Sequence, residues 1–157
     1  MRPLLAVLLF AAAFVSALAA DIAFVRVWPA WRTEESFRRI SEYFDGKENT
    51  GSQIVLRTHA DTRAGYYFLI RVSNTGAALS GAKFVLHLIA PDSAEPKLFS
   101  FPADVPAGAA VFQLGLTGAD WPGEKKAHAV AWKLAFVAAD GRVLAEQKSF
   151  LWEKPAK

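Results

Sequence analysis

Apolar and polar residues alternate through most of the chain after residue 20, which is the pattern of half-buried β-strands. In 65–73, for example, every even-numbered residue is apolar or aromatic, whereas the odd-numbered residues include Arg71 and Ser73. Pro29 would end the first such segment, because proline cannot donate a backbone hydrogen bond. The alternation predicts eight strands, at 22–28, 53–58, 65–73, 82–90, 97–101, 110–116, 130–137 and 142–152.

Turn-forming residues separate these segments. Asp140-Gly141 stands between the last two of them and predicts a β-hairpin. Clusters of Asn, Ser, Asp, Gly and Pro at 74–76, 91–93 and 118–123 predict loops. Because the strands after residue 53 follow one another without intervening helices, we expect their pairing to be antiparallel.

One segment near the N-terminus has a helical period instead. Phe37, Ile40 and Phe44 recur at intervals of three and four residues, acidic residues fill the first turn, and Gly46 follows the last apolar position. We therefore predict a single helix over about 34–44, with its apolar stripe packed on the sheet. If that stripe is fully buried, Phe44→Ala would cost about 3–5 kcal/mol.

Eight short strands at roughly ten-residue spacing resemble an immunoglobulin-like or fibronectin-III-like antiparallel β-sandwich. The resemblance is one of architecture, because the disulfide typical of antibody domains is absent and Trp132 lies on a late strand. A closed barrel is the alternative. We expect one domain over residues 20–152, with the short helix inserted near its N-terminus and a frayed tail at 153–157.

The first nineteen residues have the order of a cleavable signal peptide. One arginine precedes an unbroken apolar run from Leu4 to Val15, and small residues follow it. The run is too short to cross a bilayer, which needs about 20 residues. Cleavage is expected after Ala19, with Ala20 as the alternative. The protein would then be exported to the periplasm or secreted from a bacterial cell, without stable insertion in the membrane.

Composition narrows the function classes. The chain has no cysteine, so it can form neither a disulfide nor a lipid thioether, and it has no cysteine nucleophile. Lys and Arg total 18 against 15 Asp and Glu, and no basic run is longer than two residues. Nucleic-acid binding is therefore not expected, because it normally needs a clustered basic surface.

The sequence lacks the recurrent catalytic motifs. It contains no Gly-x-Ser-x-Gly elbow, no phosphate-binding loop and no Gly-x-Gly-x-x-Gly. His59, His87 and His128 lie in three separate segments without zinc-site spacing, so we predict no metal and no cofactor. No pair of carboxylates stands out for glycoside hydrolysis, which leaves a hydrolase as the least favoured function.

Four residues are candidates for ligand binding. Tyr67 and Arg71 share one face of their strand, and Arg57 on the neighbouring segment could join them to bind an anion or to stack on a sugar. Trp121 lies in a Gly- and Pro-containing loop, where an exposed indole could serve as a sugar platform or a protein hot spot. The ordinary alternatives are a solvated sheet face and a tryptophan that plugs the end of the sandwich.

The sequence thus favours a non-catalytic interaction module over an enzyme. Loops at one end, or a sheet edge that accepts a strand from a partner protein, would form its binding surface. The alternative is a small carbohydrate-binding or accessory protein that uses exposed aromatic residues. Trp28 and Trp31, on either side of Pro29, are weaker candidates for the same use.

Overall fold

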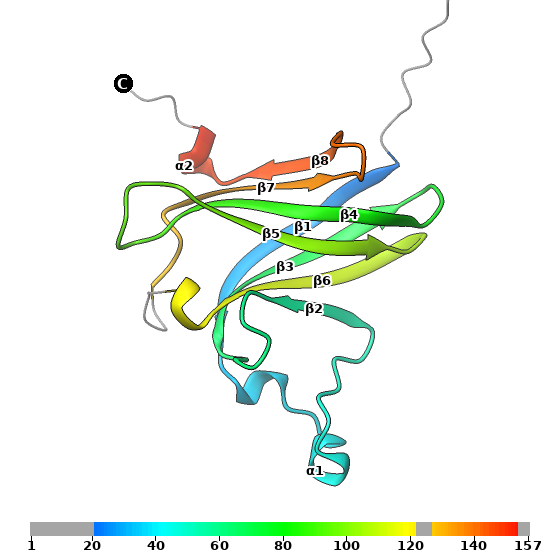
Figure 1. Ribbon diagram of the computed structural model, residues 1–157, viewed down its shortest axis with the longest axis vertical. Helices are drawn as coiled ribbons and strands as arrows, with labels where there is room; N and C mark the ends of the chain where they lie inside the picture. Colours follow the sequence, from blue (N-terminus) through cyan, green and yellow to red (C-terminus); the bar gives the residue numbers. More distant parts are fainter. Residues whose placement is uncertain (1–20, 122–126, 154–157) are drawn as a thin grey trace, which may run out of the picture.

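The alternating segments form two four-stranded β-sheets that pack face to face (Figure 1). The structure is a computed structural model and describes residues 21–121 and 127–153. It confirms the predicted β-sandwich. In chain order the elements are β1 (Ile22–Arg32), the 3-10 helix η1 (Glu35–Phe37), α1 (Glu42–Asp45), β2 (Gln53–Arg57), β3 (Gly65–Asn74), β4 (Leu79–Ile89), β5 (Lys97–Val105), β6 (Gly108–Thr117), the 3-10 helix η2 (Gly118–Asp120), β7 (Ala131–Val137), β8 (Val143–Lys148) and α2 (Phe150–Glu153).

The strand order is that of an immunoglobulin-like sandwich with one added strand. The sheets run β1-β3-β6-β2 and β5-β4-β7-β8. β1, β3 and β6 take the places of strands A, B and E, whereas β4, β7 and β8 take those of C, F and G. β5, at the edge beside β4, takes the place of C′. The added strand is β2, which comes from the connection between β1 and β3 and lies at the other sheet's edge, beside β6. It pairs parallel to β6, so the prediction of antiparallel pairing is wrong for this strand.

Phenylalanine rings fill the space between the sheets. Phe84 of β4 lies 4.9 Å from Phe112 of β6 and 4.8 Å from Phe136 of β7, measured between ring centroids, and all three side chains are fully buried. Burying a side chain of this size contributes about 1.5–3 kcal/mol. Packing of such rings therefore holds the sandwich together in a chain that cannot form disulfides.

The predicted helix at 34–44 is wrong as a single element. The chain forms two short helices, η1 and α1, instead of one. The helical conformation is interrupted at Arg38, where the backbone is extended with ψ 131°. Phe37 is buried, whereas Ile40 and Phe44 are 77% and 86% exposed. The segment projects from the end of the sandwich (Figure 1), so only the first residue of its apolar stripe reaches the sheet.

Several strand ends also differ from the prediction: β5, for example, runs through Pro102 to Val105 instead of ending at 101, and β4 begins at Leu79 instead of 82. β1 continues through Pro29 to Arg32, because it is an edge strand, and proline is tolerated at a sheet edge. The last strand stops at Lys148, after which the chain turns into α2. The predicted hairpin at Asp140-Gly141 is confirmed by the antiparallel pairing of β7 with β8. The predicted signal peptide and residues 154–157 of the predicted tail lie outside the described residues.

Candidate functional site

The outer face of the β1-β3-β6-β2 sheet holds three of the four predicted ligand-binding residues. Strand register decides which side chains meet there, because residues on neighbouring strands that lie opposite one another point to the same face. Arg26 lies opposite Arg71, and Tyr67 lies opposite Gly115. The face comprises Arg26, Trp28, Ala30 and Arg32 of β1, Tyr67, Leu69 and Arg71 of β3, Val111, Gln113 and Gly115 of β6, and Gln53, Val55 and Arg57 of β2.

Arg57 and Tyr67 meet as predicted, but across a third strand. β2 forms no hairpin with β3, because β6 lies between them. Gly115 of β6 makes the contact possible, since a Cβ atom there would lie 2.4 Å from the Tyr67 ring. The Tyr67 hydroxyl accepts a hydrogen bond from Arg57 Nε at 2.7 Å and donates one to the Arg63 carbonyl oxygen at 2.6 Å. Burial raises the pKa of Tyr67.

Carboxylates from the projecting segment neutralise this end of the face. Glu48 accepts hydrogen bonds of 2.8 and 2.5 Å from Arg57, and Glu42 accepts one of 2.7 Å from Arg63. These hydrogen bonds hold the pKa values of Glu48 and Glu42 below their usual range. Because each guanidinium already has a carboxylate partner, Arg57 and Arg63 serve to hold the protein's own segment rather than an external anion.

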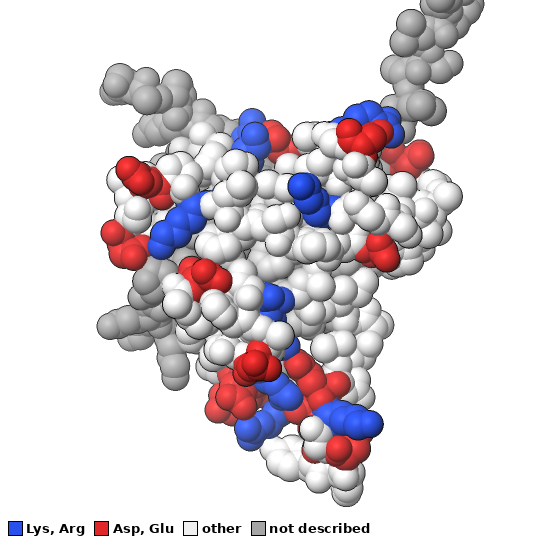
Figure 2. All heavy atoms as spheres, in the orientation of Figure 1, with Lys and Arg blue, Asp and Glu red and all other residues white. Residues whose placement is uncertain are grey.

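Phe37 attaches the segment 33–52 to the sheet. Its ring packs on Tyr67 with 4.7 Å between centroids, and the guanidinium carbons of Arg32 and Arg57 lie 4.7 and 4.9 Å from its centre. Figure 2 shows acidic and basic side chains intermixed over this projection, with fewer of them on the sandwich above it. The segment therefore covers one end of the outer face and leaves the other end open.

The open end is hollowed into a groove. One hollow of about 400 Å³ and a second of about 220 Å³ adjoin at Trp28 and Leu69, which line both, so we treat them as the two halves of one groove. We call it the sheet-face groove. It is lined by Val25, Arg26, Trp28, Ala30, Arg32, Gln53, Tyr67, Leu69, Arg71, Val111 and Gln113.

An exposed tryptophan and two arginines give the groove its chemical character. Trp28 is 53% exposed, and the Arg26 guanidinium carbon lies 4.5 Å from the centre of its ring. In the part of the chain that the structure describes, neither Arg26 nor Arg71 has a carboxylate within ion-pairing distance. A β-bulge between Phe24 and Arg26 adds Val25, 59% exposed, to the lining.

The two glutamines of the groove are occupied with each other. Gln113 is almost fully buried, accepts a hydrogen bond of 3.3 Å from Arg32 and donates one to the side-chain oxygen of Gln53. This leaves Trp28, the aliphatic side chains and the guanidinium groups to meet a ligand.

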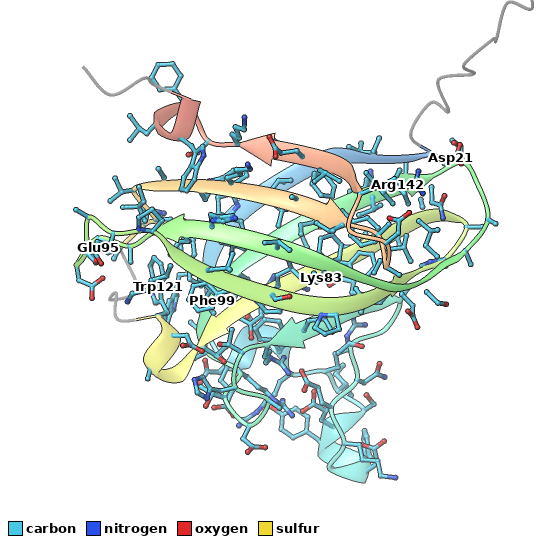
Figure 3. The ribbon with its side chains drawn as sticks, turned by 45° about the horizontal axis from the view of Figure 1, so that its top comes forward. Asp21, Lys83, Glu95, Phe99, Trp121 and Arg142 are labelled. Atoms are coloured by element: carbon cyan, nitrogen blue, oxygen red, sulfur yellow. The ribbon has the colours of Figure 1, made fainter. Side chains whose placement is uncertain are left out.

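Trp121 is a core residue, and its predicted role as an exposed platform is wrong. It is only 5% exposed and stacks on Tyr66 with 4.2 Å between ring centroids and 11° between planes. Figure 3 shows it beside η2, at one end of the sandwich. The aromatic ring of Tyr66 offers the apolar surface that the indole needs, so Trp121 closes the sandwich rather than facing a ligand.

The histidines do not gather into a metal site among the described residues. His59 lies 3.1 Å from an oxygen of Asp120, His87 lies near Trp152, and His128 packs edge-on against Tyr66. Residues 21–121 and 127–153 contain no group of three or more side chains placed to hold a metal ion. In the same residues, no helix is long and apolar enough to cross a membrane.

Comparison with known proteins finds structural neighbours but no match by sequence. No protein-family model matches the chain, and no curated protein matches it by sequence. The crystal structure of an immunoglobulin-like protein from Pseudomonas aeruginosa is 16% identical, covers 83% of this chain and 96% of its own, and superposes with a TM-score of 0.34. Because that score is below 0.5, the immunoglobulin-like assignment rests on the strand order described above.

Proposed function

We propose that this chain is an exported, non-catalytic recognition module that binds an extended segment of a partner protein in the sheet-face groove. The observation that carries the proposal is the half-exposed Trp28, which lies beside Arg26 and Arg71 in a hollow with no carboxylate among its lining residues. Tryptophan and arginine are the residues most enriched at the energetic centres of protein interfaces.

The dimensions of the groove suit an extended chain. It follows β1 from Arg26 to Arg32, a distance of about 20 Å at the usual rise of about 3.3 Å per residue. A peptide of about six residues in the extended conformation would fill that length. The hydroxyl of Tyr67 and the carboxylates of Glu42 and Glu48 are engaged with arginines of the chain itself, which favours a structural role for them over catalysis.

Carbohydrate binding is the second candidate, and the exposed ring of Trp28 is the observation that favours it. Sugars stack on such rings, but sugar sites also need side-chain groups that hydrogen-bond hydroxyls. The Gln113 NH2 and the Gln53 oxygen are bonded to each other, and the groove has no carboxylate to accept hydrogen bonds from hydroxyls, which leaves mainly guanidinium donors for a sugar. A glycan array probed with the wild type and with Trp28→Ala would decide this alternative.

Export is the remaining part of the proposal. Cleavage after Ala19 would leave two residues before β1, which begins at Ile22, so the proposed cleavage site precedes the first strand of the sandwich. N-terminal sequencing of protein recovered from the periplasm or the medium should begin at residue 20 or 21. Recovery of the full-length chain only from the cytoplasm would contradict the proposed export.

A displayed library of random twelve-residue peptides tests the recognition function directly. Residues 20–157 should enrich a family of related peptides, and Trp28→Ala should abolish that enrichment. Phe150→Ala is the matched control, because Phe150 is 78% exposed but lies on α2, away from the groove. A library that yields no peptide distinguishing the wild type from Trp28→Ala would refute binding in the groove.

A further inference from the structure

We infer that the sheet-face groove selects an acidic peptide segment, whose carboxylates are bound by Arg26 and Arg71. The inference rests on the proposed function, to which it adds the chemistry of the partner. The segment would be extended, with acidic residues at the end of the groove that holds the two arginines and apolar residues over Trp28.

The register of β1 and β3 provides the first argument. Arg26 and Arg71 lie directly opposite each other on neighbouring strands, in an arrangement that is destabilising for two like charges. Elsewhere in the described chain, Arg38, Arg57, Arg63 and Arg142 each have a carboxylate partner within 3.0 Å. Arg32 and Arg39 are held by hydrogen bonds to Ser36, Gln113 and Thr50. Within the described chain Arg26 and Arg71 have neither kind of partner, and a bound carboxylate would supply the missing counter-charge.

The orientation of Arg26 provides the second argument. Its guanidinium lies over the ring of Trp28 at 4.5 Å. In a stack of this kind the flat face of the guanidinium covers the ring, while its N–H groups, which lie in the guanidinium plane, remain available at the edge. Arginine binds carboxylates through two parallel hydrogen bonds from that edge. Trp28 thus holds Arg26 ready to bind an anion at little cost in side-chain entropy.

The surface around the arginines favours a peptide over an acidic polysaccharide. Val25, Trp28, Leu69 and Val111 line the same hollow and offer no hydrogen bond to a sugar ring beyond the indole N–H. An extended peptide presents a side chain to the groove at every second residue. A segment that is acidic over one half and apolar over the other would therefore present both kinds of side chain on the face that meets the groove, acids to the guanidiniums and apolar residues to the apolar lining.

Three synthetic peptides separate charge recognition from peptide recognition. Each has eight residues and an N-terminal fluorescein, with four valines followed by four glutamates, four glutamines or four lysines, so that either face of the extended peptide carries both kinds of side chain. Binding to residues 20–157 is followed by fluorescence anisotropy. We expect the glutamate peptide to bind at least tenfold more tightly than the glutamine peptide, and the lysine peptide most weakly. Added salt should weaken the binding of the glutamate peptide most, because the charges are partly exposed.

Substitutions locate the effect. Arg26→Gln and Arg71→Gln should each weaken the glutamate peptide about fivefold, the upper range for one exposed ion pair. Arg142→Gln is the matched control, because Arg142 is 67% exposed and lies in the turn between β7 and β8, at one end of the other sheet (Figure 3). Arg26→Gln and Arg71→Gln should not lower the melting temperature, since both residues are exposed, make no ion pair within the described chain and repel each other.

Each contrary result has a distinct meaning. Equal binding of the glutamate and glutamine peptides, or unchanged binding by Arg71→Gln, would overturn acid selection but leave peptide binding in the groove standing. Binding of an oligouronate in place of the glutamate peptide would assign the groove to an acidic glycan and overturn the inference. Failure of all three peptides, when the library does yield binders, would also overturn it. The proposed function itself fails only if the library yields no peptide that distinguishes the wild type from Trp28→Ala.

Discussion

Phe37→Ala tests how the segment 33–52 is held against the sheet. Phe37 is 7% exposed, and burial of such a ring contributes about 1.5–3 kcal/mol. Its contact with Tyr67 adds about 0.5–1.5 kcal/mol, and each guanidinium over it adds about 0.5–1 kcal/mol. These contributions overlap, and the site can relax after truncation. We therefore expect the free energy of unfolding to fall by about 3–4 kcal/mol.

Phe44→Ala is the matched control for this measurement. It makes the same change seven residues further along the same segment, but at a side chain that is 86% exposed, so it should cost less than about 0.5 kcal/mol. Urea unfolding of residues 20–157, followed by tryptophan fluorescence, measures both variants. A cost below about 1 kcal/mol for Phe37→Ala, or a larger cost for Phe44→Ala than for Phe37→Ala, would refute the idea that Phe37 anchors the segment.

Three further predictions concern the same structure. Gly115→Ala should lower the melting temperature and cost about 1–3 kcal/mol, because its methyl group would displace the ring of Tyr67; unchanged melting would show that the ring has room to move. The hydrogen bonds from Arg57 are the main cause of the lowered pKa of Glu48. Ionised Glu48 therefore stabilises the folded protein above the usual glutamate pKa of about 4.3, and this contribution is lost as the pH falls below that value. Melting temperatures from pH 7 to pH 3 should fall more steeply for the wild type than for Glu48→Gln. Trp121→Ala should lower the free energy of unfolding by about 3–5 kcal/mol, while the protein that remains folded binds the glutamate peptide with unchanged affinity. Weakened binding with unchanged stability would instead show that Trp121 contacts the ligand.

The strands could be predicted because alternation reports burial directly. The inward positions from Tyr66 to Val72 in β3 and from Ala82 to Leu88 in β4 are apolar or aromatic, and a one-residue error would turn the whole set to solvent. The same logic failed for 34–44, since a helical stripe indicates only that its residues could share a face. Phe37 packs on Tyr67, whereas Ile40 and Phe44 extend beyond the sheet and are exposed.

The candidate site was only partly predictable, because alternation within a strand does not identify its neighbour. Arg57 and Tyr67 were expected to meet, yet the contact depends on β6 coming between their strands with a glycine at the crossing point. The groove needed two further facts that sequence does not reveal: the pairing of β1 with β3 and the bulge before Arg26. Trp28 was only a weaker candidate from the sequence, although its position two residues after Arg26 on an alternating strand places both side chains on one face.

The insertion between β1 and β3 begins and ends at a matched pair of residues. Arg32 lies directly opposite Gly65, so the chain leaves the sandwich and returns to it at neighbouring points. Surface loops whose ends are already close tolerate changes in length at a small entropic cost. Evolution could therefore lengthen, shorten or replace 33–64 while the pairing of β1 with β3 stays intact. Proteins built on this scaffold could diverge in how far the groove is covered, and hence in the length of segment they admit, without rebuilding the sandwich.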